Sequence, residues 1–334
     1  MALEEHLTPE MQQLMARAQT EMKQENWHDA AETLTAVYEA LATFEINYRL
    51  VTALFMDEQY QLAASYADDF LLNYLESEPD FRMVVALAVQ NQNFVYAQQL
   101  AMLWDEGSVQ NDVLEEIRAA EDRARVDMAN TFQTIARQFY HLSDYSITEQ
   151  RDRYESARHL PVAEFIVGAF YLLIDPYATP IIRATLLEDL QKLRVSDPVQ
   201  YRWLDDNLYT IQLDELPLLT DSEIFEEIAD YLDEKVGQDD PIALEMLAQQ
   251  VRFELTLLYP RVNDVVTDPE GWVEASIDQY YERPNFSEMA EQKKWHEIVR
   301  DLTTNFFKNY TQPIYILLIC RYNNFWLKEP EKRN

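Results

Sequence analysis

An aromatic residue followed three places later by alanine recurs three times near the start of this chain. The pairs are Trp27 with Ala30, Tyr60 with Ala63, and Phe94 with Ala97, so successive copies lie 33 and 34 residues apart. A period of this length is typical of stacked helical hairpins, in which each hairpin buries its apolar face against the next one. The chain is therefore predicted to begin with an array of helical pairs.

A small or β-branched residue lies nine positions before each of these aromatic residues, namely Ala18, Val51 and Val85. Two antiparallel helices approach closely where small side chains meet, so each of these residues is predicted to face the alanine of its own copy. Start signals agree, because Thr8-Pro9 places a capping residue before a proline at the first helical position. The predicted helices span 9–23, 28–41, 44–57, 60–75, 79–90 and 93–105.

This register resembles that of the tetratricopeptide repeat (TPR) over positions 10–105. The resemblance rests on the spacing and the alanines, since Ala18, Val51 and Val85 replace the usual glycine. The aromatic residue that the family carries in the first helix is replaced by Glu21, Leu54 and Ala88. The resemblance implies an α-solenoid whose first helices line a concave groove that binds a peptide or a protein. The alternative is an unrelated array of helical hairpins, which would change little about function.

The same register assigns residues to the groove. They are Gln12, Met15, Gln19 and Met22 in the first pair, Glu45, Tyr48, Arg49, Thr52 and Phe55 in the second, and Arg82, Ala86, Val89 and Gln90 in the third. Tyr48 and Phe55 are expected to anchor a partner, and Arg49 and Arg82 to orient an acidic group on it. Alternatively, Tyr48 and Phe55 belong to the core. Met15 and Gln19 stand where a carboxylate clamp would begin, so capture of a C-terminal carboxylate is not expected.

The chain is strongly acidic, with 60 Asp and Glu residues against 27 Lys and Arg residues and a formal net charge of −33. Such a charge repels nucleic-acid phosphates and anionic membranes. The expected partner is therefore a protein or peptide that is basic or carries an apolar anchor. A hydrophobic content of 48% and only four glycines fit a folded helical protein.

Three features bear on the compartment. Cys320 is the one cysteine, so no internal disulfide can form, as expected in a reducing cytoplasm. The first residues lack the basic and apolar regions of a signal peptide. The apolar run Ile314–Cys320 is shorter than the roughly twenty residues that span a bilayer. A cytoplasmic protein is expected, with Cys320 buried and slow to react with thiol reagents.

The repeat register ends at Gly107-Ser108, which predicts a TPR-like domain over 1–108 and a mainly helical domain over 109–334. The second domain is predicted to begin with one long helix or two joined helices over 109–142. A β-hairpin is predicted within 199–213, because two runs of strand-forming residues flank Asp205-Asp206-Asn207. The other predicted helices span 161–174, 179–194, 221–236, 241–259, 269–282 and 287–309.

Two further resemblances concern this second half. Two helices followed by a hairpin resemble a winged helix-turn-helix with Ile181–Leu193 as the reading helix, but the acidic charge disfavours DNA binding. Repeats followed by a helical domain around a hairpin also resemble TPR-repeat proteins of unassigned function from Gram-positive bacteria. That likeness is carried by residues 180–190 and by Asp214–Pro217, and it implies no chemistry.

No catalytic, cofactor-binding or metal-binding motif is legible. The four glycines are isolated, which excludes a phosphate-binding loop, and the five histidines are dispersed along the chain. His296 beside Trp295 and Glu297 comes nearest to a site, and it is predicted to be a surface histidine. The sequence thus predicts a mostly α-helical, non-catalytic interaction protein without cofactor. The alternative is an enzyme with its site in the C-terminal domain.

Overall fold

The computed structural model describes residues 8–237, 239–283 and 290–309. These residues are mostly helical, with one two-stranded antiparallel sheet, as the sequence predicts. The chain divides into two compact units, residues 1–168 and 169–334. Helix α11, Val162–Ile174, contains the boundary between them.

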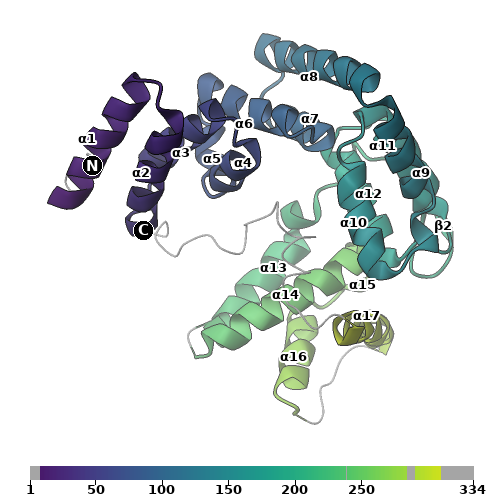
Figure 1. Cartoon of the computed structure of the whole chain (residues 1–334). Helices are drawn as coiled ribbons and strands as arrows, with labels where there is room; N and C mark the ends of the chain where they lie inside the picture. Colours follow the sequence, from purple (N-terminus) through teal and green to yellow (C-terminus); the bar gives the residue numbers. More distant parts are fainter. Residues whose placement is uncertain (1–7, 238, 284–289, 310–334) are drawn as a thin grey trace. The chain divides into compact units, whose positions relative to one another are not determined.

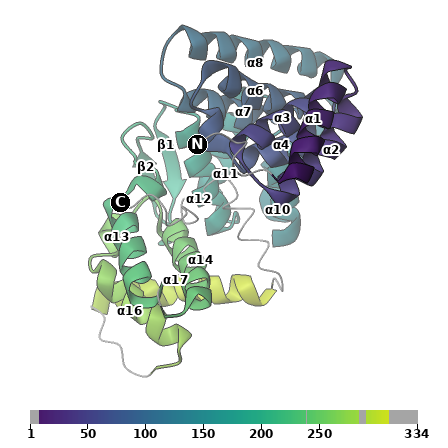
Figure 2. The same cartoon turned by 90° about the vertical axis from the view of Figure 1, so that its left-hand side faces the viewer.

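Unit 1 consists of helices joined by short turns (Figure 1). Before α11 they are α1 Pro9–Lys23, α2 Trp27–Ala40, α3 Phe44–Met56, α4 Tyr60–Asp68, α5 Leu71–Tyr74, α6 Glu78–Gln90, α7 Phe94–Leu103, α8 Ser108–Asp127, α9 Ala129–Tyr140 and α10 Ile147–Ala157. Neighbours in the chain contact each other from α1 to α4, and α6, α7 and α8 all contact one another (Figure 2). The six small residues predicted at the helix contacts, Ala18, Val51, Val85 and the three repeated alanines, are all buried.

Helices α1, α3 and α6 begin in the same way. The side chains of Thr8, Thr43 and Ser77 each accept a hydrogen bond from the backbone N–H three residues later, at 3.3–3.4 Å. Such a cap satisfies one of the four N–H groups that a helix start leaves without a partner. These caps recur at nearly the period of the aromatic residues, so the first helix of each pair starts in register.

The same three helices also end in the same way. Glu25, Glu58 and Gln92 have left-handed backbone conformations, with φ of 60°, 59° and 58°. In each turn the following N–H donates to a carbonyl five residues back, at 2.9 Å. This is the Schellman closure of a helix end, which usually places glycine at the left-handed position. The turn therefore recurs at spacings of 33 and 34 residues without any glycine.

We expect Glu58→Gly to raise the free energy of unfolding by about 0.5–1 kcal/mol, because glycine adopts a positive φ without the steric penalty of a side chain. Ser65→Gly, in the exposed interior of α4, is the matched control and should lower stability by a few tenths of a kcal/mol. Urea denaturation of both variants measures the two shifts. Two shifts of the same sign would contradict the conformation assigned to Glu58.

One predicted helix of unit 1 is divided. The span 60–75 forms α4 and then the short α5, with a break at Asp69-Phe70. Asp69 accepts a hydrogen bond from the Tyr38 hydroxyl at 2.7 Å, and the Phe70 ring lies 6.2 Å from that of Phe44. These contacts join the break to α2, which carries Tyr38, and to α3, which carries Phe44.

Unit 1 extends well past residue 108, where the sequence placed the domain boundary, because side chains of the first 108 residues bind later helices. Arg158, which is buried, donates to Gln99 at 2.9 Å, and its carbonyl accepts the Val95 N–H. Two later helices of this unit, α8 and α11, are also joined by side-chain contacts. Arg125 of α8 makes two hydrogen bonds of 2.9 Å to Glu164, and this pairing lowers the pKa of Glu164.

Unit 2 holds the remaining elements. They are α12 Pro180–Lys192, β1 Val199–Arg202, β2 Leu208–Ile211, α13 Glu223–Leu232, α14 Pro241–Leu258, α15 Val262–Val265, α16 Pro269–Tyr280 and α17 Ala290–Asn309. The predicted hairpin is confirmed, with Val199 opposite Ile211 and Arg202 opposite Leu208. Trp203, at its turn, is buried and donates its indole N–H to the carbonyl of Leu258 at 3.0 Å. The hairpin is thereby fixed to the end of α14.

The two joined helices predicted over 109–142 are confirmed as α8 and α9. Helices α10 and α15 were not predicted. Helix α10 is mostly polar and so lacks the apolar periodicity on which the prediction relied. The predicted start of α17, residues 287–289, lies outside the described residues, as do Cys320 and the run Ile314–Cys320. Within the described ranges, no helix is both long and apolar enough to cross a membrane.

Candidate partner-binding surface

The residues that the register assigned to a groove differ in exposure. Met15 is buried and belongs to the core. The exposed ones are Gln12, Gln19, Glu45 and Gln90; the half-buried ones are Met22, Tyr48, Arg49, Thr52, Phe55, Arg82, Ala86 and Val89. Most of these positions on α1, α3 and α6 are thus at least partly accessible.

Tyr48 and Phe55 are half-buried parts of aromatic clusters. The Tyr48 ring lies 6.2 Å from the rings of Phe44 and Tyr74, and the Phe55 ring lies 5.3 Å from that of Tyr60. Both residues pack against the hydrophobic core of unit 1. Removing either ring would therefore also remove packing, so these two aromatics cannot report on partner binding alone.

One face of α3 carries a stripe of exposed and half-buried residues. Glu45, Arg49, Thr52 and Met56 are spaced by four, three and four residues, which places them on one helix face. Met56 is 49% exposed, the most exposed large apolar residue of the first helices α1, α3 and α6. It was missed in the sequence, although its position four residues after Thr52 was a sufficient signal.

Ion pairs join the corresponding faces of α6 and α8. Arg82 donates from Nε to Glu78 at 2.9 Å and from Nη1 to Glu116 at 3.0 Å, and its Nη2 lies 3.9 Å from Asp112. Glu116 lies 34 residues after Arg82, so the ion pair joins α6 to α8 at a spacing close to that of the repeated turns. We call this set the first-helix surface: Glu45, Arg49, Thr52 and Met56 of α3, Glu78, Arg82, Ala86 and Val89 of α6, and Asp112 and Glu116 of α8.

The arginines of the first-helix surface are already paired. Arg49 donates to Glu45 at 2.8 Å, and Arg82 faces three carboxylates. The hydrogen bond to Glu78 is the main reason why the pKa of Arg82 is raised. An acidic group of a partner would have to share both arginines with the carboxylates that they already bind. The surface presents four carboxylates against two guanidinium groups.

A buried polar cluster lies in unit 2, where the sequence predicted a surface histidine. His296 is buried, and its ring stacks on Trp272 with the centroids 4.1 Å apart. Glu254 is fully buried; its Oε2 accepts the Trp272 indole N–H at 3.0 Å and lies 3.6 Å from His296 Nε2. Its Oε1 accepts from Gln250 at 2.9 Å. The prediction for His296 was wrong because its partners lie on α14 and α16, distant in sequence.

The residue types of this cluster suggest a serine–histidine–acid triad, but its geometry does not form one. Ser276 Oγ lies 3.5 Å from His296 Nε2, the same nitrogen that faces Glu254. In a triad the acid and the nucleophile bind different ring nitrogens. The Ser276 hydroxyl donates to the Trp272 carbonyl at 3.0 Å, and the residue is fully buried. The cluster is a buried network that joins α14, α16 and α17.

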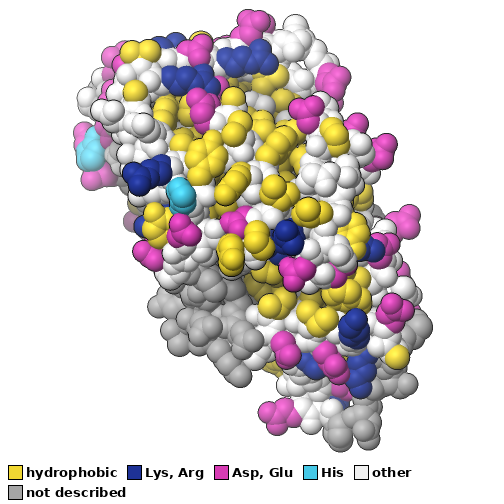
Figure 3. Space-filling view, turned by 90° about the vertical axis from the view of Figure 1, so that its right-hand side faces the viewer, with side chains coloured by type: hydrophobic (Ala, Val, Ile, Leu, Met, Phe, Trp, Pro, Cys, Tyr) yellow, Lys and Arg dark blue, Asp and Glu magenta, His cyan; other side chains and the backbone are white. Residues whose placement is uncertain are grey.

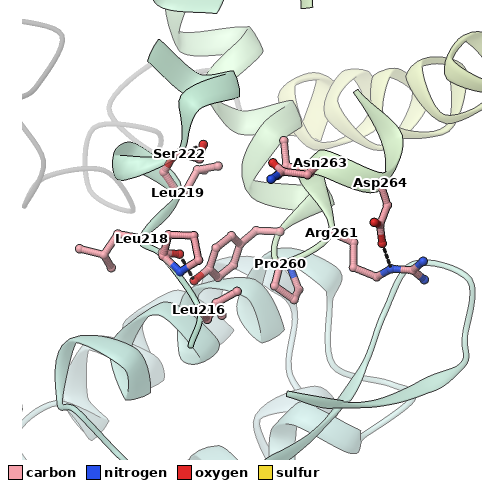
Figure 4. Close-up of a pocket in the computed structure, with 11 residues that line it drawn as sticks. Leu216, Leu218, Leu219, Ser222, Pro260, Arg261, Asn263 and Asp264 are labelled. Atoms are coloured by element: carbon pink, nitrogen blue, oxygen red, sulfur yellow. Dashed lines mark hydrogen bonds and ion pairs between the residues drawn. The ribbon is translucent and has the colours of Figure 1, made fainter. Parts of the chain in front are cut away.

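A small pocket in unit 2 lies between residues 216–222 and 259–264, with a volume of about 110 Å³ (Figure 4). Small-molecule sites usually have volumes of about 300–1,000 Å³, so this pocket has room for little more than one side chain. Arg261 is turned toward Asp264, at 2.7 Å, and away from Leu218 and Leu219. Its guanidinium also lies over the Tyr209 ring at 4.4 Å. The one strong cation of the pocket is thus engaged within the protein.

Helix α11 also carries exposed apolar residues. Val167, Tyr171 and Ile174 are 58%, 57% and 39% exposed and share a face at helical spacing. Hydrophobic side chains are gathered on the face of the molecule that Figure 3 shows. A stripe of this kind is typical of a surface that a partner covers.

Comparisons with known proteins find no match. No protein family matches the chain, and neither a curated protein nor a solved structure is significantly similar to it.

Proposed function

We propose that unit 1 is a non-catalytic interaction module of TPR-like helical pairs, which binds a peptide or a protein segment through the first-helix surface. The observation that carries this proposal is the recurrence of one turn geometry at Glu25, Glu58 and Gln92. Equal turns give each first helix the same orientation toward the second helix of its own pair. Under this proposal, equivalent residues of these first helices form one extended surface.

The contacts of Arg82 support this reading. The hydrogen bond from Arg82 to Glu116 joins α6 to α8 between residues that are 34 positions apart, the spacing of the second and third turns. The first-helix surface also combines an exposed apolar residue, Met56, with polar and charged neighbours. Grooves that bind peptides combine apolar anchors with polar groups in this way.

The test uses random peptides displayed on phage and selected on the immobilised full-length chain. The variant Met56→Gln with Ala86→Gln replaces one apolar anchor and places a bulky polar side chain in the surface. We expect peptides selected on the natural chain to lose binding to this variant, with an unchanged circular-dichroism melting curve.

The matched control is Leu62→Gln with Leu72→Gln, which changes two exposed apolar residues on α4 and α5. Peptides should bind this control as they bind the natural chain. Equal binding to both double variants would remove the first-helix surface from the proposal. A library that yields no enriched peptide would count against it as well.

A further inference from the structure

The charges of the first-helix surface define the partner more closely. The four carboxylates are those of Glu45, Glu78, Asp112 and Glu116. Glu45 is matched by Arg49, whereas Glu78, Asp112 and Glu116 share the single guanidinium of Arg82. At neutral pH the surface therefore keeps an excess of two negative charges, and each of its two arginines already binds at least one carboxylate.

The excess charge is accessible. The side chains of Asp112 and Glu116 are 64% and 68% exposed, although each lies within 4 Å of Arg82. A carboxylate in this position can accept a second donor, because its two oxygens offer about four lone-pair sites. The apolar part of the surface, Met56, lies on α3 of the same unit.

Resting on the proposed function, we infer that the partner segment is basic: it places a lysine or arginine against Asp112 and Glu116 of the first-helix surface and an apolar side chain against Met56. An acidic segment would meet only paired arginines and an excess of carboxylates. Complementary charge of this kind selects a partner and speeds its approach.

The same phage library tests the inference through the composition of the selected peptides. We expect enrichment of lysine and arginine together with an aliphatic or aromatic residue. The dissociation constant of a selected peptide should rise about three- to tenfold in Asp112→Asn with Glu116→Gln, because two partly exposed ion pairs are lost. Higher salt should weaken binding to the natural chain more than binding to this variant.

The control is Glu39→Gln with Glu115→Gln, which removes the same charge at exposed residues outside the first-helix surface. Binding to it should stay close to that of the natural chain. If both double variants lose binding equally, only the overall negative field attracts the peptides, and the inference is wrong. If binding depends on Met56 but the peptides are neutral or acidic, the inference fails while the proposed function stands. If binding does not depend on Met56, both fail.

Discussion

Replacing Trp272 with alanine should lower the free energy of unfolding of unit 2 by roughly 3–5 kcal/mol, the range found for large aromatic residues in cores. The ring is fully buried, so its loss leaves a cavity, and the stack with His296 disappears. The variant also leaves Glu254 Oε2 without the indole donor. A buried carboxylate that loses a donor adds its desolvation cost to that of the cavity.

Trp272→Phe separates these two effects. Phenylalanine retains most of the apolar surface and a ring that can stack on His296, but it has no N–H for Glu254. We expect this variant to lose about 1–3 kcal/mol, the cost of one unsatisfied buried acceptor. Urea denaturation monitored by circular dichroism measures both variants. If both variants lose the same free energy of unfolding, the indole hydrogen bond to Glu254, and not the packing of the ring, accounts for the stabilisation by Trp272.

Gly168→Ala is expected to destabilise unit 1 by roughly 1–3 kcal/mol, although alanine is the better helix former. A Cβ atom at residue 168 would lie 2.5 Å and 2.6 Å from two ring carbons of Phe139. Phe139 is fully buried and stacks on Phe165 at 5.3 Å, so its ring cannot withdraw without repacking. The overpacking cost should exceed the gain of about 1 kcal/mol in helix propensity.

The second variant in this test is Gly168→Ala combined with Phe139→Leu, which gives the new methyl group space. Phe139→Leu alone should be destabilising because it leaves a cavity. The double variant should be more stable than the sum of the two single losses predicts, as is usual for residues in contact. Strict additivity in thermal or urea denaturation would show that the two side chains do not meet as described.

The sequence predicted the regular parts of the fold because their signals are local. The aromatic–alanine period located the helices of the first 105 residues, and two strand-like runs located the hairpin at Val199–Ile211. The break at Phe70 was not predictable, since it depends on rings of the preceding helices. Helix α10 was missed although Ser146 and Glu149 form a capping box, a local signal that was available.

For the candidate site, local reasoning gave the positions but not their partners. The register placed Arg82 on the first-helix surface, yet its pairing with Glu116 depends on α8, which lay outside the predicted repeats. Residue Glu116 stands one period beyond Arg82, so extending the register by one copy would have found it. The cluster around Glu254 is different, because no sequence period connects α14, α16 and α17.

The course of α11 determines where the chain can be divided for experiments. Residues 168 and 169 belong to different units but to one unbroken helix, so no linker marks the boundary. A fragment ending at residue 168 would expose the carbonyl groups of a severed helix end, which have no intrahelical partner. Peptide-binding assays are therefore best made with the intact polypeptide, and limited proteolysis is not expected to release unit 1 by cleavage at this point.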